Sequence, residues 1–293
     1  MMDPSCRMVG VTVTPFLRDC TPDLEEIFRQ TQRMTAAQAD AILPCASTGD
    51  FVKMSFADRI RVLETVAEAN EGKKFLLAGA CEASASGAVQ AIQAAKRLNY
   101  TGCIVCPPYY YPQDQQAVLA FYRQVCQGAE GMPVIAYHVP AFTTGIEIST
   151  FRKLLEIPNL VGIKDSSANM KRIAHLCDIA AQERPGFMVY TGTDDCLLPA
   201  LCAGCAGSMT ALAASMPQSI RGIYDAFDKG DLKTAMERQR AILPIIRLAD
   251  DFAFPLGYKL LAKAAGWRIE EDFSAAELAQ YEQMRAALQA LQA

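Results

Sequence analysis

The feature that most constrains this chain is a regular alternation of two kinds of segment. Eight short runs of apolar and β-branched residues, bounded by glycine, proline or polar residues, predict β-strands. They cover residues 8–13, 41–45, 75–80, 102–106, 133–138, 160–164, 187–191 and 207–211. Segments with the helical period lie between them, at residues 23–39, 56–70, 84–98, 114–128, 149–156, 169–183 and 195–203.

Several of the predicted strands are apolar on both faces, as parallel strands covered by helices are. Eight successive βα units predict a (β/α)8 TIM barrel, an α/β fold, over residues 1–225. Further helical segments follow at 217–229, 232–248, 252–265 and from Ser274 onward, where Ser274 and Glu277 have capping-box spacing. We therefore expect a C-terminal helical extension of about three helices, residues 226–293, packed on the barrel.

Composition excludes several classes of protein. With 293 residues and 51% hydrophobic content, the chain can bury a large core and is not predicted to be disordered. The net charge of −4 is spread without basic blocks, which argues against a nucleic-acid partner. No apolar stretch reaches the length of a membrane span, and residues 1–10 lack a secretion signal, so no membrane partner is expected. Eleven cysteines, an odd number, indicate buried thiols and a cytoplasmic location.

In barrels of this type the reacting side chains gather at the carboxyl ends of the strands. Among the polar residues at these ends, Lys164 directly follows an apolar run and shares a strand face with Gly162, so we expect it to point inward. Loss of water disfavours the charged ammonium, and a neutral amine can attack a carbonyl to form a Schiff base. The ordinary alternative is a solvated surface lysine.

A Schiff base needs a neighbouring group that moves protons on and off the substrate carbon. Tyr137 ends the preceding predicted strand and is close enough to serve. A phenol is a weak base unless hydroxyl groups relay its proton, which makes Ser47 and Thr48 relevant. Their alternative interpretation is an ordinary polar turn before Gly49.

Five motifs together resemble the dihydrodipicolinate synthase and N-acetylneuraminate lyase superfamily, whose members are class I pyruvate-type aldolases. The resemblance covers nearly the whole chain, including the helical tail. The motifs are GVTVTPF at 10–16, ASTGD at 46–50, YHVP at 137–140, GIKDS at 162–166 and GTDD at 192–195.

The resemblance implies a role for each matching residue. Lys164 would form the imine with a 2-oxo acid such as pyruvate, and Tyr137 would shuttle protons. Ser47, Thr48 and the turn at Gly49 would bind the substrate carboxylate.

Either Tyr109 or Tyr110 would complete a proton relay across a tight dimer interface, since the alignment of the YYY run is ambiguous by one residue. The family also implies a homotetramer built as a dimer of dimers, and no cofactor beyond the covalent lysine imine.

Departures from the family pattern bear on the substrate. After the YHVP motif the chain reads AFTTG, with Thr143 in a loop that lacks the arginine typical of the synthases. The sialic-acid lyases have Asp-Glu where this chain has Asp194 and Asp195, and a serine where it has Ala211. These differences favour an aldolase or dehydratase for 2-keto-3-deoxy sugar acids or related hydroxy-oxo acids.

For such substrates we expect contacts from Thr143, Gly192, Asp194 and Thr210. For Asp194, capping of the following helix is an alternative role. Dihydrodipicolinate synthase, acting on pyruvate and aspartate semialdehyde, and N-acetylneuraminate lyase remain alternative activities. A barrel that has lost catalysis and only binds a 2-oxo acid is the non-enzyme alternative.

No metal site is predicted. Two CxxC motifs, Cys103 to Cys106 and Cys202 to Cys205, would suggest a four-thiolate zinc centre. The first pair lies in a predicted strand, where residues three apart face opposite sides, so the sulfurs cannot converge. With His138 and His175 as the only histidines, a histidine-rich centre is also unavailable.

Overall fold

Eight strands follow one another in chain order around a closed barrel in the computed structural model, which describes residues 3–292. They are β1 (Met8–Val11), β2 (Ala41–Leu43), β3 (Phe75–Gly79), β4 (Gly102–Val105), β5 (Val134–His138), β6 (Leu160–Asp165), β7 (Met188–Thr191) and β8 (Gly207–Thr210). Each strand falls within one of the eight predicted runs or exceeds it by a single residue, and the TIM-barrel prediction is confirmed.

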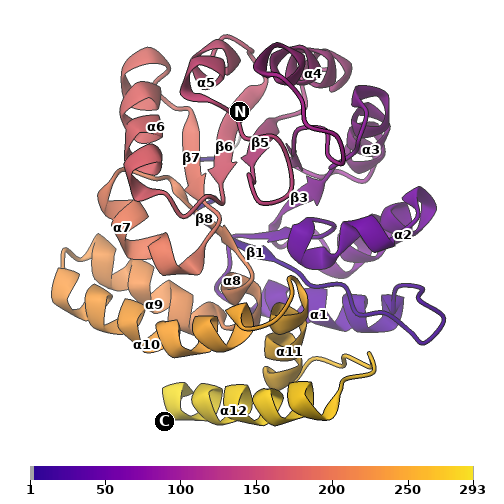
Figure 1. Cartoon of the computed structure of the whole chain (residues 1–293), viewed down its shortest axis with the longest axis vertical. Coiled ribbons are helices and arrows are strands. Elements are labelled where there is room, and N and C mark those ends of the chain that lie inside the picture. The colour runs from indigo at the N-terminus through magenta and orange to yellow at the C-terminus, as the bar shows by residue number, and fades with distance from the viewer. Residues whose placement is uncertain (1–2, 293) are drawn as a thin grey trace. The chain divides into compact units, whose positions relative to one another are not determined.

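The helices alternate with the strands and then continue past them (Figure 1). They are α1 (Leu24–Ala36), α2 (Phe56–Asn70), α3 (Ala85–Arg97), α4 (Gln115–Gly128), α5 (Ile148–Leu154), α6 (Met170–Glu183), α7 (Leu197–Cys202), α8 (Leu212–Ser215), α9 (Pro217–Asp228), α10 (Leu232–Asp250), α11 (Leu256–Ala264) and α12 (Ala275–Gln292). Short 3₁₀ turns are η1 (Ser47–Gly49), η2 (Phe51–Lys53) and η3 (Asp194–Cys196).

Helix starts follow from the sequence. The side chains of Asp23, Ser55, Ser84, Asp114 and Asn169 each accept a hydrogen bond from a first-turn amide of the helix that follows. The predicted helix 252–265 begins only at Leu256. Pro255 precedes it, and a proline both lacks an N–H and disfavours helical backbone in the residue before it.

The chain divides into two compact units. The first comprises the chain up to Val9 together with Phe75–Thr210, and the second comprises Gly10–Lys74 together with the chain from Ala211 onward. In the first unit, β3 to β8 pair in parallel, with α3 to α7 between them. All residues of β4 to β8 are buried, as strands covered on both faces should be.

In the second unit, α1 packs on α2, and α12 packs on both α10 and α11 (Figure 1). The α10–α11 approach is close: a Cβ on Gly257 would lie 1.9 Å from the Ala249 carbonyl oxygen, so only glycine fits. The capping box of α12 is present, since the Ser274 hydroxyl accepts from the Glu277 N–H and the Glu277 carboxylate accepts from the Ser274 N–H. The predicted helical extension is therefore confirmed.

Candidate active site

Lys164 and Tyr137 form the centre of the candidate site in the first unit. The two residues are register partners on β6 and β5, so their side chains leave the sheet at the same level. The Lys164 Nζ lies 4.4 Å from the centroid of the Tyr137 ring. Both are buried, at 3% and 4% exposure, so the amine is removed from bulk water and in contact with an aromatic face.

A second tyrosine, Tyr122 on α4, holds the backbone of Tyr137. Its hydroxyl accepts from the Tyr137 N–H at 3.3 Å and donates to the Val105 carbonyl of β4 at 2.8 Å. Burial raises the pKa of this phenol well above its usual value, so it stays neutral and can both donate and accept. Sequence reasoning missed Tyr122 because an aromatic residue on the apolar face of a helix looks like ordinary core.

Two glycines allow close packing around β6. A Cβ on Gly192 would lie 1.9 Å from Ser166 Oγ and 2.7 Å from Lys164 Cε. A Cβ on Gly162, two residues before the lysine, would lie 2.7 Å from the Met188 carbonyl oxygen of β7. Gly192 therefore gives space to Ser166 and Lys164, and any contact with substrate adds to that.

Behind Lys164 lies a buried polar cluster built on Asp165. Its carboxylate accepts from Arg172 Nε at 2.7 Å and from the backbone N–H and hydroxyl of Ser167. The His138 Nδ1 accepts from the Ile146 N–H at 2.9 Å, while its Nε2 lies 3.9 Å from Asp165. The cluster joins β5, β6 and α6.

His138 is neutral at physiological pH. Burial lowers its pKa to about 4, with Asp165 acting in the opposite direction and Arg172 in the same one. With its Nδ1 accepting a hydrogen bond, the ring holds the loop after β5 in place. The ring is therefore a packing and loop-holding group, since the lone pair of its Nδ1 is already used in this hydrogen bond.

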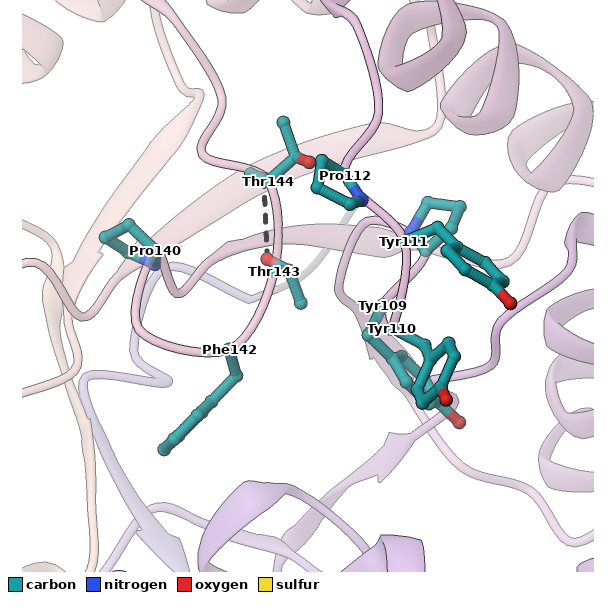
Figure 2. A pocket seen from close by; sticks show the side chains of 9 residues that line it. Tyr109, Tyr110, Tyr111, Pro112, Pro140, Phe142, Thr143 and Thr144 are labelled. Carbon is teal, nitrogen blue, oxygen red and sulfur yellow. Dashed lines mark hydrogen bonds between the residues drawn. The ribbon is translucent and has the colours of Figure 1, made fainter.

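The loops after β4 and β5 line an open pocket of about 280 Å³. Figure 2 shows Tyr109, Tyr110 and Tyr111 on one side of it, with Phe142 and Thr143 on the other. A β-bridge between Tyr109 and Thr143 links the two loops.

Tyr110 and Tyr111 are 86% and 71% exposed, whereas Tyr109 is half-buried. Tyr110 has a φ of +82°, which is unusual for a residue other than glycine.

Two further predicted residues lie near the carboxyl ends of β7 and β8. Asp194 is buried and begins η3, where Thr193 occupies the capping position without a side-chain hydrogen bond. Thr210 is 2% exposed at the end of β8, and no hydrogen-bond partner for its hydroxyl exists among residues 3–292. A buried hydroxyl without a partner is uncommon in folded proteins and suits a ligand contact.

The predicted carboxylate-binding residues lie in the second unit. Ser47, Thr48 and Gly49 form the 3₁₀ turn η1 directly after β2, with Thr48 buried and Ser47 half-buried. A Cβ on Gly49 would lie 3.1 Å from the Thr12 carbonyl oxygen, so this turn packs closely on the end of β1.

Nowhere in residues 3–292 do three or more histidine, cysteine, aspartate or glutamate side chains gather as metal ligands would. Within that same range, no helix combines the length and apolar character that crossing a bilayer requires.

Known proteins resemble the chain over most of its length. A DapA-like lyase of Thermofilum pendens is 32% identical over 269 residues, covering 89% of each protein. A 4-hydroxy-tetrahydrodipicolinate synthase of Chlorobium luteolum is 31% identical, covering 80% of this chain and 79% of the other. The structure of YagE from E. coli K12, in complex with pyruvate, matches with a TM-score of 0.90 at 21% identity over 98% of both chains.

The model of the dihydrodipicolinate synthetase family matches residues 4–291. Because that match spans nearly the whole chain, and because two relatives above 30% identity cover most of it, this chain is a lyase of the dihydrodipicolinate synthetase family.

Proposed function

We propose that Lys164 forms an imine with a 2-oxo acid, pyruvate being the common half of the reaction. The observation that carries this proposal is the buried amine of Lys164 in contact with the Tyr137 ring, at the carboxyl ends of adjacent parallel strands. YagE, which shares the fold, was crystallised with pyruvate, which supports the choice of oxo acid.

The reaction needs no further reagent. The Lys164 nitrogen adds its lone pair to the C2 carbonyl, and the addition product takes up one proton and loses water as the iminium forms. Removal of a C3 proton gives the enamine, which attacks an aldehyde to form a carbon–carbon bond; in the reverse direction the bond breaks and releases pyruvate. Water then hydrolyses the imine and restores the lysine. Tyr137 carries the protons between these steps.

Ser47 and Thr48 bind the substrate carboxylate with their hydroxyls and with the N–H groups at the start of η1. Gly49 lets the turn approach the end of β1. The hydroxyls thereby orient the carboxylate of the oxo acid.

For the second half of the substrate we propose a neutral polyol chain, as in 2-keto-3-deoxy sugar acids. The loop after β5, residues 139–147, contains no arginine or lysine that would hold a second carboxylate. Thr143 in this loop and Thr210 at the end of β8 offer hydroxyls, and Asp194 offers a buried carboxylate. These groups suit sugar hydroxyls.

Condensation of pyruvate with aspartate semialdehyde is the second candidate. It is favoured by the 31% identity to a 4-hydroxy-tetrahydrodipicolinate synthase. Turnover with aspartate semialdehyde, compared with a panel of hydroxyaldehydes, separates the two candidates. Faster turnover of the semialdehyde would overturn the sugar-acid proposal.

We propose a homo-oligomer in which Tyr110, rather than Tyr109, enters the partner's site. Its exposure and its strained backbone support this choice, since such strain persists where function requires it. The family resemblance supports a tetramer built from two tight dimers.

Mixing two inactive variants tests donation across the interface. Coexpression of Lys164→Ala with Tyr110→Phe should restore about one quarter of wild-type activity, because each mixed dimer regains one complete site. Coexpression that restores no activity would exclude donation by Tyr110.

We also propose a cytoplasmic location, and the state of the cysteines supports it. Nine of the eleven are buried, and no disulfide is formed within the described residues.

Borohydride trapping tests the central step. Incubation with pyruvate and sodium borohydride should add the mass of one reduced pyruvate to each chain, and Lys164→Ala should gain none. An unmodified wild-type chain that is folded would exclude pyruvate. Pyruvate C3 proton exchange in D2O, followed by NMR, then measures enamine formation without knowledge of the aldehyde.

A further inference from the structure

A second buried lysine lies in the helical extension, far along the chain from any predicted site residue. Lys259 on α11 is 1% exposed. Its Nζ lies 3.1 Å from Asp50 Oδ2, contacts the Glu271 carboxylate, and sits 4.8 Å from the centroid of the Phe16 ring. A buried amine with two carboxylates is an expensive arrangement to build and is retained only where its partners are well placed.

Asp50, the partner of this lysine, ends the Ser47–Gly49 turn. Its N–H donates to the Ser47 carbonyl at 3.0 Å, and its φ of +54° is in the left-handed region. Its carboxylate is 5% exposed and also pairs with Lys53 at 2.8 Å. The residue that closes the turn is therefore held by its side chain as well as by its backbone.

The turn is supported from two sides within the second unit. On one side, Gly49 lies against the end of β1, where its Cβ position is 3.3 Å from Thr14 Oγ1. On the other side, Lys259 contacts both Asp50 and the ring of Phe16, two residues beyond Thr14. The amine of Lys259 on α11 thus contacts both the turn, through Asp50, and the segment that follows β1, through Phe16.

We propose that Lys259 is a positioning residue: through Asp50 it sets the place of the turn that binds the substrate carboxylate. The inference rests on the function proposed above for Ser47 and Thr48. It makes the helical extension part of the substrate site rather than an addition to the barrel. Without the amine, the carboxylates of Asp50 and Glu271 repel each other, and Asp50 loses its contact with α11 and is left with the exposed Lys53 of η2 as its ion-pair partner.

The test compares Lys259→Met and Asp50→Asn with their double variant. Each single change should raise the KM for pyruvate about tenfold to a hundredfold, since small displacements of a binding group have effects of that size. The maximal fraction of chain trapped by borohydride at saturating pyruvate should stay at the wild-type level. The KM for pyruvate of the double variant should not exceed that of the more affected single variant, because both substitutions act through one contact.

Arg268→Met is the matched control. Arg268 also ties the extension to the rest of the second unit, by an ion pair with Asp23 at 2.8 Å, but it does not contact the turn. The control should leave the KM for pyruvate unchanged. An unchanged KM in Lys259→Met would overturn the proposal, and so would a reduced trapped fraction at unchanged KM. The proposal would also fail if the increase in KM of the double variant were the product of the two single increases.

Amide hydrogen exchange separates this proposal from the proposed function. In the absence of pyruvate, the peptide covering residues 46–54 should exchange faster in Lys259→Met and in Asp50→Asn than in wild type. Asp50→Asn leaves Lys259 paired with Glu271, so it serves even if Lys259→Met folds poorly. If wild type traps no pyruvate, the imine proposal fails alone. Unchanged exchange in this peptide would refute the positioning role.

Discussion

Two lysines of this chain are buried to nearly the same degree and have opposite surroundings. Lys164, in the first unit, contacts the face of Tyr137, and no carboxylate within residues 3–292 pairs with it. Lys259, in the second unit, is flanked by the carboxylates of Asp50 and Glu271. Burial alone therefore does not define a reactive amine.

The difference lies in charge compensation. An ammonium between two carboxylates is stabilised as a charge and serves to hold its partners. A buried amine without a carboxylate partner is not held in an ion pair, and its nitrogen can reach a substrate carbonyl and act as a nucleophile. The first arrangement suits structure, and the second suits chemistry.

The largest expected contrast comes from the same substitution at both positions. Lys164→Met should abolish pyruvate C3 exchange, by at least about a thousandfold, with stability unchanged or raised. Lys259→Met should keep measurable exchange at saturating pyruvate but lose about 3 kcal/mol of stability, because Glu271 loses its buried cation and Asp50 keeps only Lys53 as an ion-pair partner. Urea unfolding and NMR exchange measure both. Equal loss of stability in the two variants would contradict the distinction.

Gly192→Ala tests whether Lys164 must keep its present position in order to react. The new methyl would meet Lys164 Cε and Ser166 Oγ, so the amine must move. We expect imine formation to slow by about a hundredfold, the effect of displacing a reacting group by roughly an ångström. The rate of borohydride trapping measures it. Gly186→Ala, a glycine with φ of +90° and no neighbour within 4 Å of its Cβ position, controls for a general effect on stability.

Tyr122→Phe tests how the Tyr137 partner is held. The change removes the hydroxyl that bridges Val105 and Tyr137 and with it two hydrogen bonds, while the two strands stay paired in their ladder. The expected cost is about 2–3 kcal/mol of stability, seen as a lower urea midpoint. Tyr111→Phe, at an exposed tyrosine, is the comparison. An unchanged midpoint would mean that water replaces the hydroxyl.

The smallest effect concerns pH and the cluster behind Lys164. In the folded chain the pKa of His138 is lowered to about 4. Between that pH and the ordinary pKa of histidine, the imidazole is therefore protonated in the unfolded chain and neutral in the folded one. His138 should therefore cost about 2 kcal/mol of stability as the pH falls from 7 to 5. Subtracting the pH profile of His138→Asn isolates this contribution. Identical profiles would show that the ring is not held neutral.

Local patterns were enough to predict much of the molecule. The strands and most helix starts follow from hydrophobic period and from capping side chains such as Ser84 and Asp114. The pairing of Lys164 with Tyr137 was predictable, because each ends a strand and consecutive strands of a barrel are neighbours. The hydrophobic period predicted a helix from residue 252, and this start was wrong. The helix α11 begins at Leu256, because Pro255 interrupts the helical backbone that the apolar pattern favours.

Contacts that depend on three-dimensional packing could not be predicted. Tyr122 has the sequence context of a core residue, and only the spacing of β4 and β5 shows that its hydroxyl bridges them. The role of Gly192 in giving space to a lysine is likewise absent from any local pattern.

Local properties of the chain were enough to predict the fold from periodicity, the family from short motifs, and the neighbouring positions of Lys164 and Tyr137 from their places at strand ends. The pairing of Lys259 with Asp50, 209 residues away in the sequence, is visible in the folded chain alone. The physical reason is that a charge is compensated by whatever folds against it. Such partners are chosen by packing, and hydrophobic pattern carries no record of them.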